Sequence, residues 1–437
     1  MTENLEKISD SFNTNFSGHL TIGGLDTLLL AKQYGTPLYV MDENKIKRNL
    51  SSFQKSIDKY YEGNGLCCYA GQAFACKQMY RIAKAMGAGI DVVSMGELYT
   101  ASSVKFNPEK ICYHGNNKSY KELNLALSYG VTHIVIDSFA EIDKLDKIAH
   151  EMNIKASCML RLCPGIEAHT HSFIQTGQID SKYGFSTQLG TAMEAVKYVL
   201  AKKNLNLLGV HCHIGSQIFD IEPFCHAAEV MLKFISDVKN ETGYEIAELN
   251  LGGGFGINYT DDDNASPYEK YMEEVASVVR TQVQLLDIKA PFIIIEPGRS
   301  IVANAGLTLY TVGNIKEIPD VRTYVAIDGG MTDNIRYALY DSKYEFLLAN
   351  KAEEEKTECV TIAGRCCESG DLLGKDVMLP KCEEGDILAT LCTGAYCYSM
   401  SSNYNRVAKP AVVFVNNGES YIGVKRETME DLIRNDI

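Results

Sequence analysis

Three short motifs carry residue types that could act on a charged small molecule. In the first, Gly252-Gly253-Gly254-Phe255-Gly256, few side chains block an approaching anion. Its backbone N–H groups could therefore converge on a phosphate, although a tight turn is the alternative. The second, Glu296-Pro297-Gly298-Arg299, sets a carboxylate close to a guanidinium. Its alternative is a strand-ending turn with a solvated charge pair.

The third motif, His211-Cys212-His213-Ile214-Gly215-Ser216, contains two imidazoles. Alternate positions of a strand point the same way, so His211 and His213 should share one face. Together with His169 and His171 they raise the question of a metal site. No carboxylate or cysteine stands at a convincing ligand spacing, so we predict no metal. The flat His213 ring is better suited to stacking on a planar ligand.

Eight apolar runs alternate with helical patterns and should position these motifs. The alternation favours an α/β fold, a closed parallel (β/α)8 barrel of the TIM type. An open doubly wound sheet is the competitor, but the nucleotide fingerprint expected at its first turn is missing. The runs fall near residues 66–70, 89–93, 110–113, 133–137, 158–163, 207–213, 247–252 and 292–296; the helices between them are expected over 74–86, 96–105, 119–128, 139–152, 189–202, 222–242 and 266–288.

The ends of these runs are unusually polar, as expected for a barrel with a site at the carboxyl ends of its strands. Besides the three motifs they include Gln72, Asp91, His114, Asp137 and Arg161. After Arg299 the pattern changes to short β-branched runs, which predicts a mostly β domain. We expect an N-terminal segment, residues 1–41, to join that β domain, residues 300–437, and the barrel to occupy residues 42–299.

Composition narrows the functional class. The net charge of −14 argues against a nucleic-acid partner and against an anionic membrane surface. No apolar run approaches the roughly 18 residues of a membrane span, and the N-terminus lacks the order of a signal peptide. The 14 cysteines then indicate reduced thiols in the cytoplasm rather than disulfides.

The stretch from Leu66 to Thr100 reads as strand, turn, helix and strand, and it resembles the cofactor-lysine region of one enzyme family. This family is the alanine-racemase-like, fold-type III, pyridoxal-phosphate decarboxylases. Its motif Tyr-Ala-x-Lys-Ala matches at Tyr69, Ala70 and Ala73, and Asp-Val-x-Ser-x-Gly-Glu-Leu matches over 91–98. Other counterparts occur at 115–118, 161–165, 180–184, 367–371 and 394–396, so the resemblance spans about residues 36–405.

The resemblance implies pyridoxal 5'-phosphate as the cofactor and a role for each matched residue. His213 would stack on the pyridine ring, and Glu296 would keep its nitrogen protonated, which strengthens the ring as an electron sink. Cys367 would return a proton to the substrate carbon after carbon dioxide leaves. The remaining cofactor-binding set would be Gln72, Asp91, Ser216, Gly253, Gly254, Gly298, Arg299 and Tyr396.

Within the family, the segment 331–340 resembles that of members that decarboxylate meso-2,6-diaminopimelate to L-lysine. This reaction is the last step of lysine biosynthesis. A substrate with a second amino-acid centre suits a guanidinium for its distal carboxylate and Glu368 for its distal ammonium. Ornithine or lysine ends in an ammonium alone, which two arginines would repel. The expected substrate-binding residues are Arg299, Arg336, Tyr340, Glu368 and Tyr396. The resemblance also implies a homodimer in which Cys367 and Glu368 enter the partner's site.

Gln72 stands where the family has its cofactor lysine. An amide nitrogen cannot form the imine with the cofactor aldehyde, as a lysine amine does. Lys77 and Lys84 lie on the following helix, where the backbone should hold them out of reach. We therefore expect an inactive or severely impaired decarboxylase. The alternatives are a related decarboxylase with another amino-acid substrate and a non-catalytic ligand-binding or regulatory protein.

Overall fold

The computed structural model describes residues 2–166 and 181–437, which divide into two compact units. We call residues 49–256 and 265–298 the barrel unit, and residues 1–48, 257–264 and 299–437 the β unit. The domain ranges 1–41, 42–299 and 300–437 stay a prediction. The two units differ from them in grouping residues 42–48, residues 257–264 and Arg299 with the β unit.

The barrel unit contains the predicted ring of eight parallel strands. The ring is closed because β13 pairs with β5 and β8 pairs with β9. Each predicted apolar run overlaps one of these strands. They are β5 (Gly65–Ala70), β6 (Gly89–Val92), β7 (Ile111–Tyr113), β8 (His133–Ile136), β9 (Ala156–Cys163), β11 (Leu205–His211), β12 (Glu248–Asn250) and β13 (Phe292–Ile295). The short strand β10 (Phe185–Ser186) adds to β9 outside the ring.

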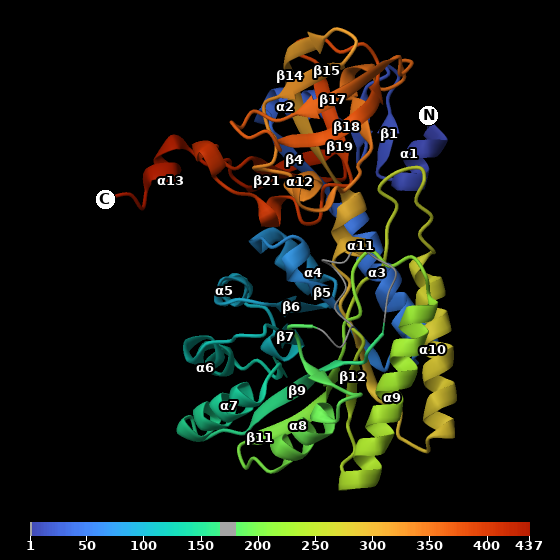
Figure 1. The fold of residues 1–437 in the computed structure, drawn as a ribbon, viewed down its shortest axis with the longest axis vertical. Coiled ribbons are helices and arrows are strands. Elements are labelled where there is room, and N and C mark those ends of the chain that lie inside the picture. Colours follow the sequence, from blue (N-terminus) through green and yellow to red (C-terminus); the bar gives the residue numbers. More distant parts are fainter. Residues whose placement is uncertain (1, 167–180) are drawn as a thin grey trace. The chain divides into compact units, whose positions relative to one another are not determined.

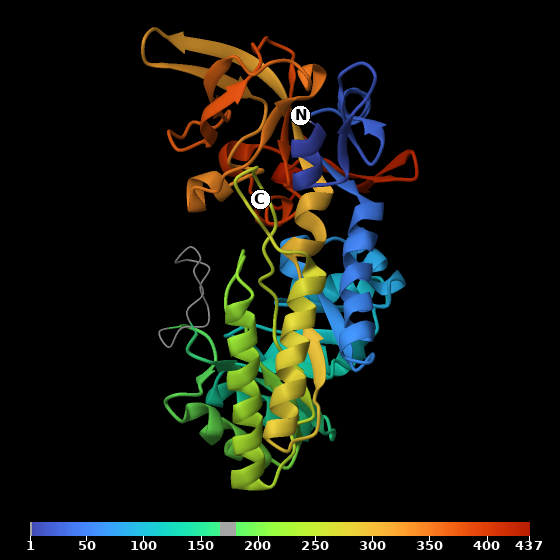
Figure 2. The same ribbon diagram turned by 90° about the vertical axis from the view of Figure 1, so that its right-hand side faces the viewer.

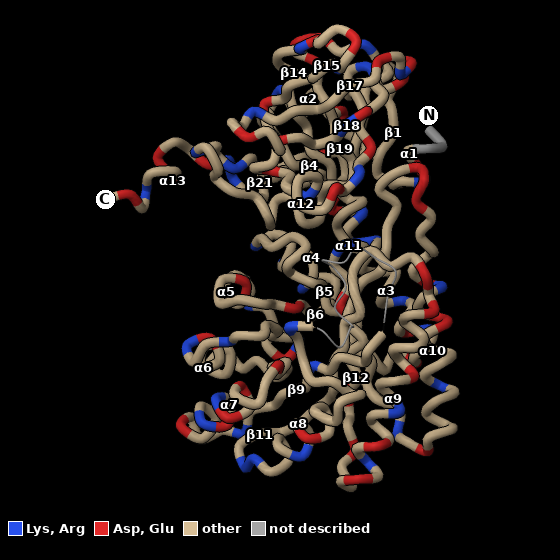
Figure 3. The backbone as a smooth tube through the Cα atoms, viewed as in Figure 1, with Lys and Arg blue, Asp and Glu red and all other residues tan. Residues whose placement is uncertain are grey.

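Helices between successive strands cover the barrel (Figure 1). They are α4 (Lys77–Ala85), α5 (Met95–Ser103), α6 (Tyr120–Tyr129), α7 (Phe139–Glu151), α8 (Thr191–Leu200), α9 (Glu222–Thr242) and α10 (Tyr268–Leu285). The long α9 and α10 run side by side, as the turned view also shows (Figure 2). Basic residues (blue) and acidic residues (red) both occur on α6, α7 and α8, as on solvated helix faces (Figure 3).

The first of these helices begins later than the sequence pattern predicts. Residues Gly71–Ala73 form a 3-10 turn, and Phe74 is extended (φ −160°, ψ 106°). The helix α4 starts only at Lys77, where the Cys76 thiol accepts the Met79 N–H at 3.4 Å as an N-cap. Phe74 is a buried apolar residue that precedes the helix. Its apolar character matches the spacing of the helical face, so the sequence pattern included it in the helix.

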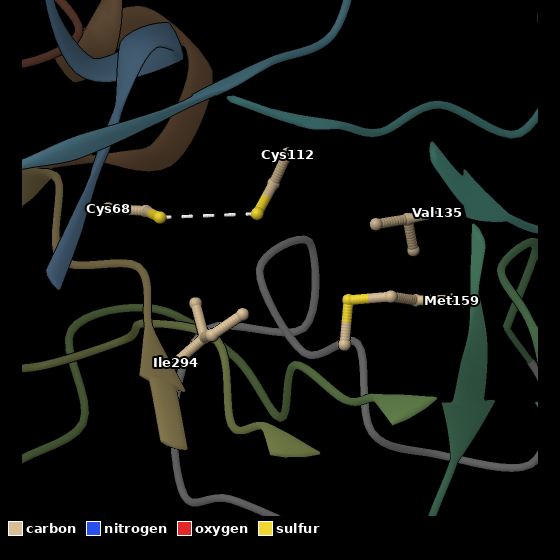
Figure 4. Close-up of a cluster of buried hydrophobic side chains, with 5 residues drawn as sticks. All are labelled: Cys68, Cys112, Val135, Met159 and Ile294. Carbon is tan, nitrogen blue, oxygen red and sulfur yellow. Dashed lines mark hydrogen bonds between the residues drawn. The ribbon is translucent and has the colours of Figure 1, made fainter. Parts of the chain in front are cut away.

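Apolar side chains from five of the strands pack together inside the barrel. Cys68, Cys112, Val135, Met159 and Ile294 come from β5, β7, β8, β9 and β13, and all are at most 1% exposed (Figure 4). The Cys68 and Cys112 sulfurs are 4.0 Å apart. Such close packing below the strand ends gives the polar residues above it a rigid base.

The β unit is built around the long strand β14 (Gly306–Ile318). This strand pairs antiparallel with β4 (Leu38–Asp42), β15 (Arg322–Ile327) and β19 (Ile387–Leu391). The pairing of β4 with β14 and with β20 (Ala411–Asn416) confirms that the N-terminal segment joins the C-terminal third. The other strands of these sheets are β16 (Phe346–Leu348), β17 (Glu358–Ala363), β18 (Leu372–Leu379) and β21 (Glu419–Val424).

Smaller elements complete the β unit. The N-terminal region forms α1 (Thr2–Ile8), the sheet of β1 (Phe12–Thr14), β2 (Leu20–Ile22) and β3 (Leu25–Asp26), and α2 (Thr27–Tyr34). The C-terminal third has only the short helices α11 (Arg299–Val302), α12 (Arg336–Tyr340) and α13 (Met429–Ile433), and α3 (Glu43–Tyr60) contains the boundary between the units. Among the residues that the structure describes, no helix is both long and apolar enough to cross a membrane.

Candidate active site

The predicted site residues fall into both units. The barrel unit holds most of the residues expected to contact the cofactor, each at or near the carboxyl end of a strand or after it: Gln72, Asp91, His213, Ser216, Gly253, Gly254, Glu296 and Gly298. The β unit holds Arg299, Arg336, Tyr340, Cys367, Glu368 and Tyr396. His169 and His171 lie outside the described residues.

Glu296 is the centre of a buried polar cluster in the barrel unit. Its Oε1 accepts hydrogen bonds from His114 Nε2 at 2.7 Å and from Asn250 Nδ2 at 2.8 Å. His211 Nε2 lies 3.3 Å from the other oxygen, Oε2. The side chains come from the ends of β7, β12, β11 and β13, so closure of the ring is what brings them together.

The charge of this cluster follows from its burial and its donors. Burial alone would raise the pKa of Glu296, but the His114 and His211 imidazoles outweigh it, and the pKa lies well below its ordinary value. Burial lowers the pKa of His211 to about 4, so this imidazole is neutral at pH 7. The site therefore presents a fixed carboxylate beside the neutral His211 ring.

This burial of His211 predicts a pH-dependent stability. The folded-state pKa lies below the unfolded value of about 6.5, so the unfolded chain binds more protons between those values. Stability is then complete above about pH 6.5 and falls as the pH drops toward 4, by about 2 kcal/mol at pH 5. We expect urea unfolding midpoints to fall accordingly in the parent chain and less in His211→Asn. The exposed His226→Asn variant is the matched control; an unchanged pH dependence in His211→Asn would contradict this account.

The turn that carries Gln72 is fixed by Asp91. The Gly71 N–H donates to Asp91 Oδ1 at 3.0 Å, and a Cβ on Gly71 would lie 2.8 Å from the Asp91 carbonyl oxygen. Burial, followed by the nearby Glu296 and Glu97 charges, raises the pKa of Asp91 well above its ordinary value. The Gln72 side chain itself is exposed.

Two lysines of the barrel unit, Lys84 and Lys118, have their ammonium groups committed to other partners. Lys84 donates to two backbone carbonyls beyond α5, at 2.7 and 3.1 Å. Lys118 is 2% exposed, donates to two backbone carbonyls at 2.6 and 2.7 Å, and pairs with Glu141 at 2.7 Å. Lys77 is exposed and is the first residue of α4, separated from Gln72 by the 3-10 turn and an extended segment.

The glycine run forms a close-packed turn beside His213. A Cβ on Gly253 would lie 2.1 Å from the Glu296 carbonyl oxygen, and one on Gly254 would lie 2.5 Å from that of Gly215. Gly254 also has a φ of +113°, a backbone angle that residues other than glycine rarely adopt. The Gly253 N–H donates to His213 Nδ1 at 3.3 Å, which orients the imidazole. A phosphate contact from Gly253 stays a prediction.

The geometry also revises which residues could hold a metal ion. Ligand atoms of His114, His211 and Glu296 all lie within 4.8 Å of one another. The sequence had directed attention to His211 with His213 and overlooked His114 in this respect, because a spacing along the chain does not show which strand ends meet across a barrel. The same three residues are already engaged with one another around the carboxylate, through the contacts above.

In the β unit, Tyr396 lies beside two buried guanidinium groups. Its ring centroid is 4.8 Å from the Arg299 guanidinium and 5.5 Å from that of Arg336. Arg299 Nη1 donates to the Tyr259 hydroxyl at 2.5 Å. Tyr396 has a φ of +60°, a strained backbone conformation of the kind that clusters at functional sites. Tyr340 lies 5.1 Å from the Arg336 guanidinium.

Arg336 has an unsatisfied donor. Arg336 is 7% exposed, and its Nη2 donates to the Ser342 hydroxyl at 3.4 Å. Its Nε has no hydrogen-bond partner among the described residues. A guanidinium is always charged and has five N–H donors in a rigid fork. Because a buried unpaired donor costs free energy, an anion is the ligand that this group would bind most favourably.

The loop carrying Cys367 and Glu368 is tied to the segment that leads to Arg336. Asp371 accepts the Met331 N–H at 2.6 Å and the Cys366 N–H at 2.7 Å, and it is 3% exposed. Cys367 and Glu368 are exposed on this loop. The two substrate-binding segments predicted from the sequence therefore share one anchor.

Sequence reasoning did not assign a site role to His114, Asn250 or Tyr259. His114 was recognised only as a polar strand end. The signal for Asn250 was an amide inside the apolar run 247–252, where a side chain that is 0% exposed needs hydrogen-bond partners. Tyr259 follows the glycine run and gave no signal of its own.

Comparison with known proteins identifies the family. The model of the pyridoxal-dependent decarboxylase pyridoxal-binding domain matches residues 43–303, which is more than half of the chain. The chain therefore belongs to the pyridoxal-dependent decarboxylase family, and pyridoxal phosphate is the cofactor that this membership implies. Within the family it groups with the diaminopimelate decarboxylases, which are lyases.

The similarity covers nearly the whole chain. Diaminopimelate decarboxylase of Bacillus methanolicus is 51% identical over 95% of this chain and 96% of its own length. That of Bacillus subtilis (strain 168) is 49% identical over 97% of this chain and 96% of its own. The crystal structure of the M. jannaschii enzyme in complex with L-lysine superposes with a TM-score of 0.91 at 36% identity, covering 98% of both chains.

Proposed function

We propose that this chain is a cytoplasmic diaminopimelate decarboxylase scaffold that binds pyridoxal phosphate and meso-2,6-diaminopimelate but turns the substrate over poorly because Gln72 replaces the cofactor lysine. The observation that carries the substrate assignment is the buried Arg336 with an unpartnered Nε. The test is to supply cofactor and meso-diaminopimelate to the Gln72→Lys variant and to follow the release of carbon dioxide and lysine. A variant that binds both but forms neither product contradicts the proposal.

The barrel unit suits the cofactor. Gly253 and Gly254 lie where a Cβ would collide with backbone, so the chain can approach a phosphate closely there. Glu296 is held as a carboxylate and faces a buried His211 with no hydrogen-bond partner on either nitrogen among the described residues. Bound pyridoxal phosphate supplies an electron sink for the substrate carbon. We assign its ring to His213 and Glu296, with Asp91 fixing the turn at Gln72.

Three further residues belong to the cofactor assignment. We propose that Ser216, Gly298 and Tyr396 serve the phosphate together with Gly253 and Gly254. A Cβ on Gly298 would lie 2.8 Å from the Ala70 Cβ, so only glycine suits this position. The support for Tyr396 is its strained backbone.

The β unit suits a substrate with two carboxylates. Arg336 offers a rigid fork for a distal carboxylate, and Arg299 offers a second buried guanidinium. Glu368 would bind the distal ammonium of the substrate. These charges orient a diamino diacid, while they oppose a substrate that ends in an ammonium alone. Cys367 would return the proton to the substrate carbon.

Gln72 removes one function from this site while leaving the others in place. A primary amide does not form a covalent bond with the cofactor aldehyde, and a lysine there also exchanges substrate in and product out. Of the two lysines on the following helix, Lys84 is committed to backbone carbonyls, and Lys77 is separated from residue 72 by the 3-10 turn and an extended segment. Binding should therefore persist while turnover falls.

We further propose that the chain acts as a two-fold homodimer, in which the exposed Cys367 and Glu368 reach the partner's cofactor site. The observation that supports this role is that Asp371 anchors the loop while the side chains of Cys367 and Glu368 are exposed. We expect sedimentation at micromolar concentration to give the mass of a dimer. A monomer under those conditions would contradict the proposal.

A further inference from the structure

The buried cluster around Glu296 determines which way its carboxylate points. The inference drawn from it rests on the proposed cofactor site. His114, His211, Asn250 and Glu296 are 7%, 1%, 0% and 6% exposed. They lie at the ends of four different barrel strands. A charged group this deeply buried needs hydrogen bonds from its surroundings, and the identity of its donors decides which oxygen remains for a ligand.

The two oxygens of Glu296 have different surroundings. Oε1 accepts both His114 Nε2 at 2.7 Å and Asn250 Nδ2 at 2.8 Å, which together use its two lone pairs. Oε2 is approached by His211 Nε2 at 3.3 Å, but this contact lacks hydrogen-bond alignment, and both His211 nitrogens lack partners among the described residues. The carboxylate is therefore anchored through one oxygen only.

The orientation of the Asn250 amide is settled by its second contact. Its Oδ1 accepts the Gly252 N–H at 2.9 Å, and a backbone N–H can only donate. The NH2 group must then point to Glu296, so this contact is a donated hydrogen bond. The Asn250 side chain thereby links the carboxylate to the start of the glycine run.

The segment that carries His114 is also locked. Its own N–H donates to the Val92 carbonyl at 2.8 Å. The buried Lys118 ammonium donates to the carbonyl of the next residue, Gly115, at 2.6 Å and pairs with Glu141. His114 donates to a carboxylate oxygen through Nε2, so this nitrogen carries a proton. Both anchoring donors are thus fixed by their own backbone or side-chain contacts.

We propose that His114 and Asn250 are positioning residues that anchor Glu296 through Oε1 and leave Oε2 for the protonated ring nitrogen of pyridoxal phosphate. Removing either donor frees the carboxylate to rotate and weakens its preference for the ionised form. The bound ring would then lose its proton at a lower pH. The phosphate contacts would remain, because they involve other residues.

The experiment uses the parent chain, titrated with pyridoxal phosphate alone. Affinity is measured by fluorescence, and the absorbance of the bound cofactor is followed from about pH 6 to about pH 9 to report ring-nitrogen protonation. The variants are Asn250→Asp, His114→Leu and the conservative His114→Gln, whose amide can still donate. Glu296→Gln gives the response to a missing charge, and Asn206→Asp, on β11 with its amide bonded to Ser157, is the matched control.

We expect Asn250→Asp and His114→Leu to weaken affinity at least about tenfold and to shift ring deprotonation toward the behaviour of Glu296→Gln. His114→Gln should keep most of the parent's affinity and most of its ring-nitrogen protonation, because its amide can still donate. Asn206→Asp should behave as the parent. An unchanged titration in Asn250→Asp and His114→Leu overturns the inference while leaving the proposed function standing. A parent chain that binds no cofactor overturns both.

Zinc ions alone provide a separate test, because His114, His211 and Glu296 could also surround a cation. If zinc binds the cofactor-free parent at micromolar concentration, is lost in His114→Leu and excludes pyridoxal phosphate, the cluster is a metal site and the inference is wrong. If zinc does not bind, or binds without depending on His114, the anchoring account is supported. Glu296→Gln reports whether any zinc binding requires the carboxylate.

Discussion

In the Gln72→Lys variant we expect decarboxylation of meso-diaminopimelate to rise by at least about 10³-fold over the parent chain, which corresponds to about 4 kcal/mol of activation free energy. The change places a primary amine on the 3-10 turn after β5, beside the Asp91 that holds this turn. The Gln72 side chain is exposed, so the longer lysine needs no repacking of the core.

Two control variants separate the amine from its charge. Gln72→Arg brings a cation of similar length without a nucleophilic amine, and Gln72→Ala removes the side chain. Both should stay at the level of the parent while folding normally by circular dichroism. If Gln72→Arg restored turnover as well as Gln72→Lys, positive charge rather than covalent chemistry would explain the effect. If the parent already turned over as fast as Gln72→Lys, Gln72 would be no impairment at all.

In the lysine-restored chain we expect Arg336→Met to lower kcat/KM for meso-diaminopimelate by about 30- to 1000-fold, as expected for losing a buried charged contact of about 2–4 kcal/mol. Most of this should appear in KM, because Arg336 would bind an end of the substrate that does not react. Arg336→Lys should recover only part, because an ammonium lacks the bidentate fork.

The substrate preference supplies the matching comparison. The lysine-restored chain should decarboxylate meso-diaminopimelate far faster than ornithine or arginine, and Arg336→Met should narrow that gap. Arg434→Met, which changes an arginine with a 70% exposed side chain, should change neither. Equal turnover of ornithine and meso-diaminopimelate would contradict the substrate assignment and favour a related decarboxylase with another substrate.

The barrel could be predicted because its signals are local. Each buried parallel strand is a short apolar run, and each covering helix has its own periodicity, so eight repeats specify a ring. The start of α4 was misplaced because Phe74 is buried without being helical, and a cysteine thiol at residue 76 is a weak cap that sequence patterns seldom reveal. Burial and helicity cannot be separated by apolar spacing alone.

The polar cluster was only partly predictable because it depends on closure of the ring. Glu296 and His211 stand at strand ends and were recognised there, but the sequence does not say that β7 and β12 bring His114 and Asn250 to the same carboxylate. The consequence of Gln72 was accessible without a structure, because it follows from the chemistry of one functional group. The structure adds that the ammonium group of Lys84, on the helix that follows, is committed to two backbone carbonyls.

The most direct test of the central claim is to load the parent chain with pyridoxal phosphate, reduce it with borohydride, and map the modified peptides by mass spectrometry. Gln72→Lys, treated in parallel, is the positive control and should carry a pyridoxyl group on residue 72. For the parent we expect saturable cofactor binding that dialysis reverses, and no pyridoxyl lysine after reduction. A stoichiometric adduct on Lys77, Lys84, Lys118 or another lysine, together with rapid decarboxylation, would contradict the account.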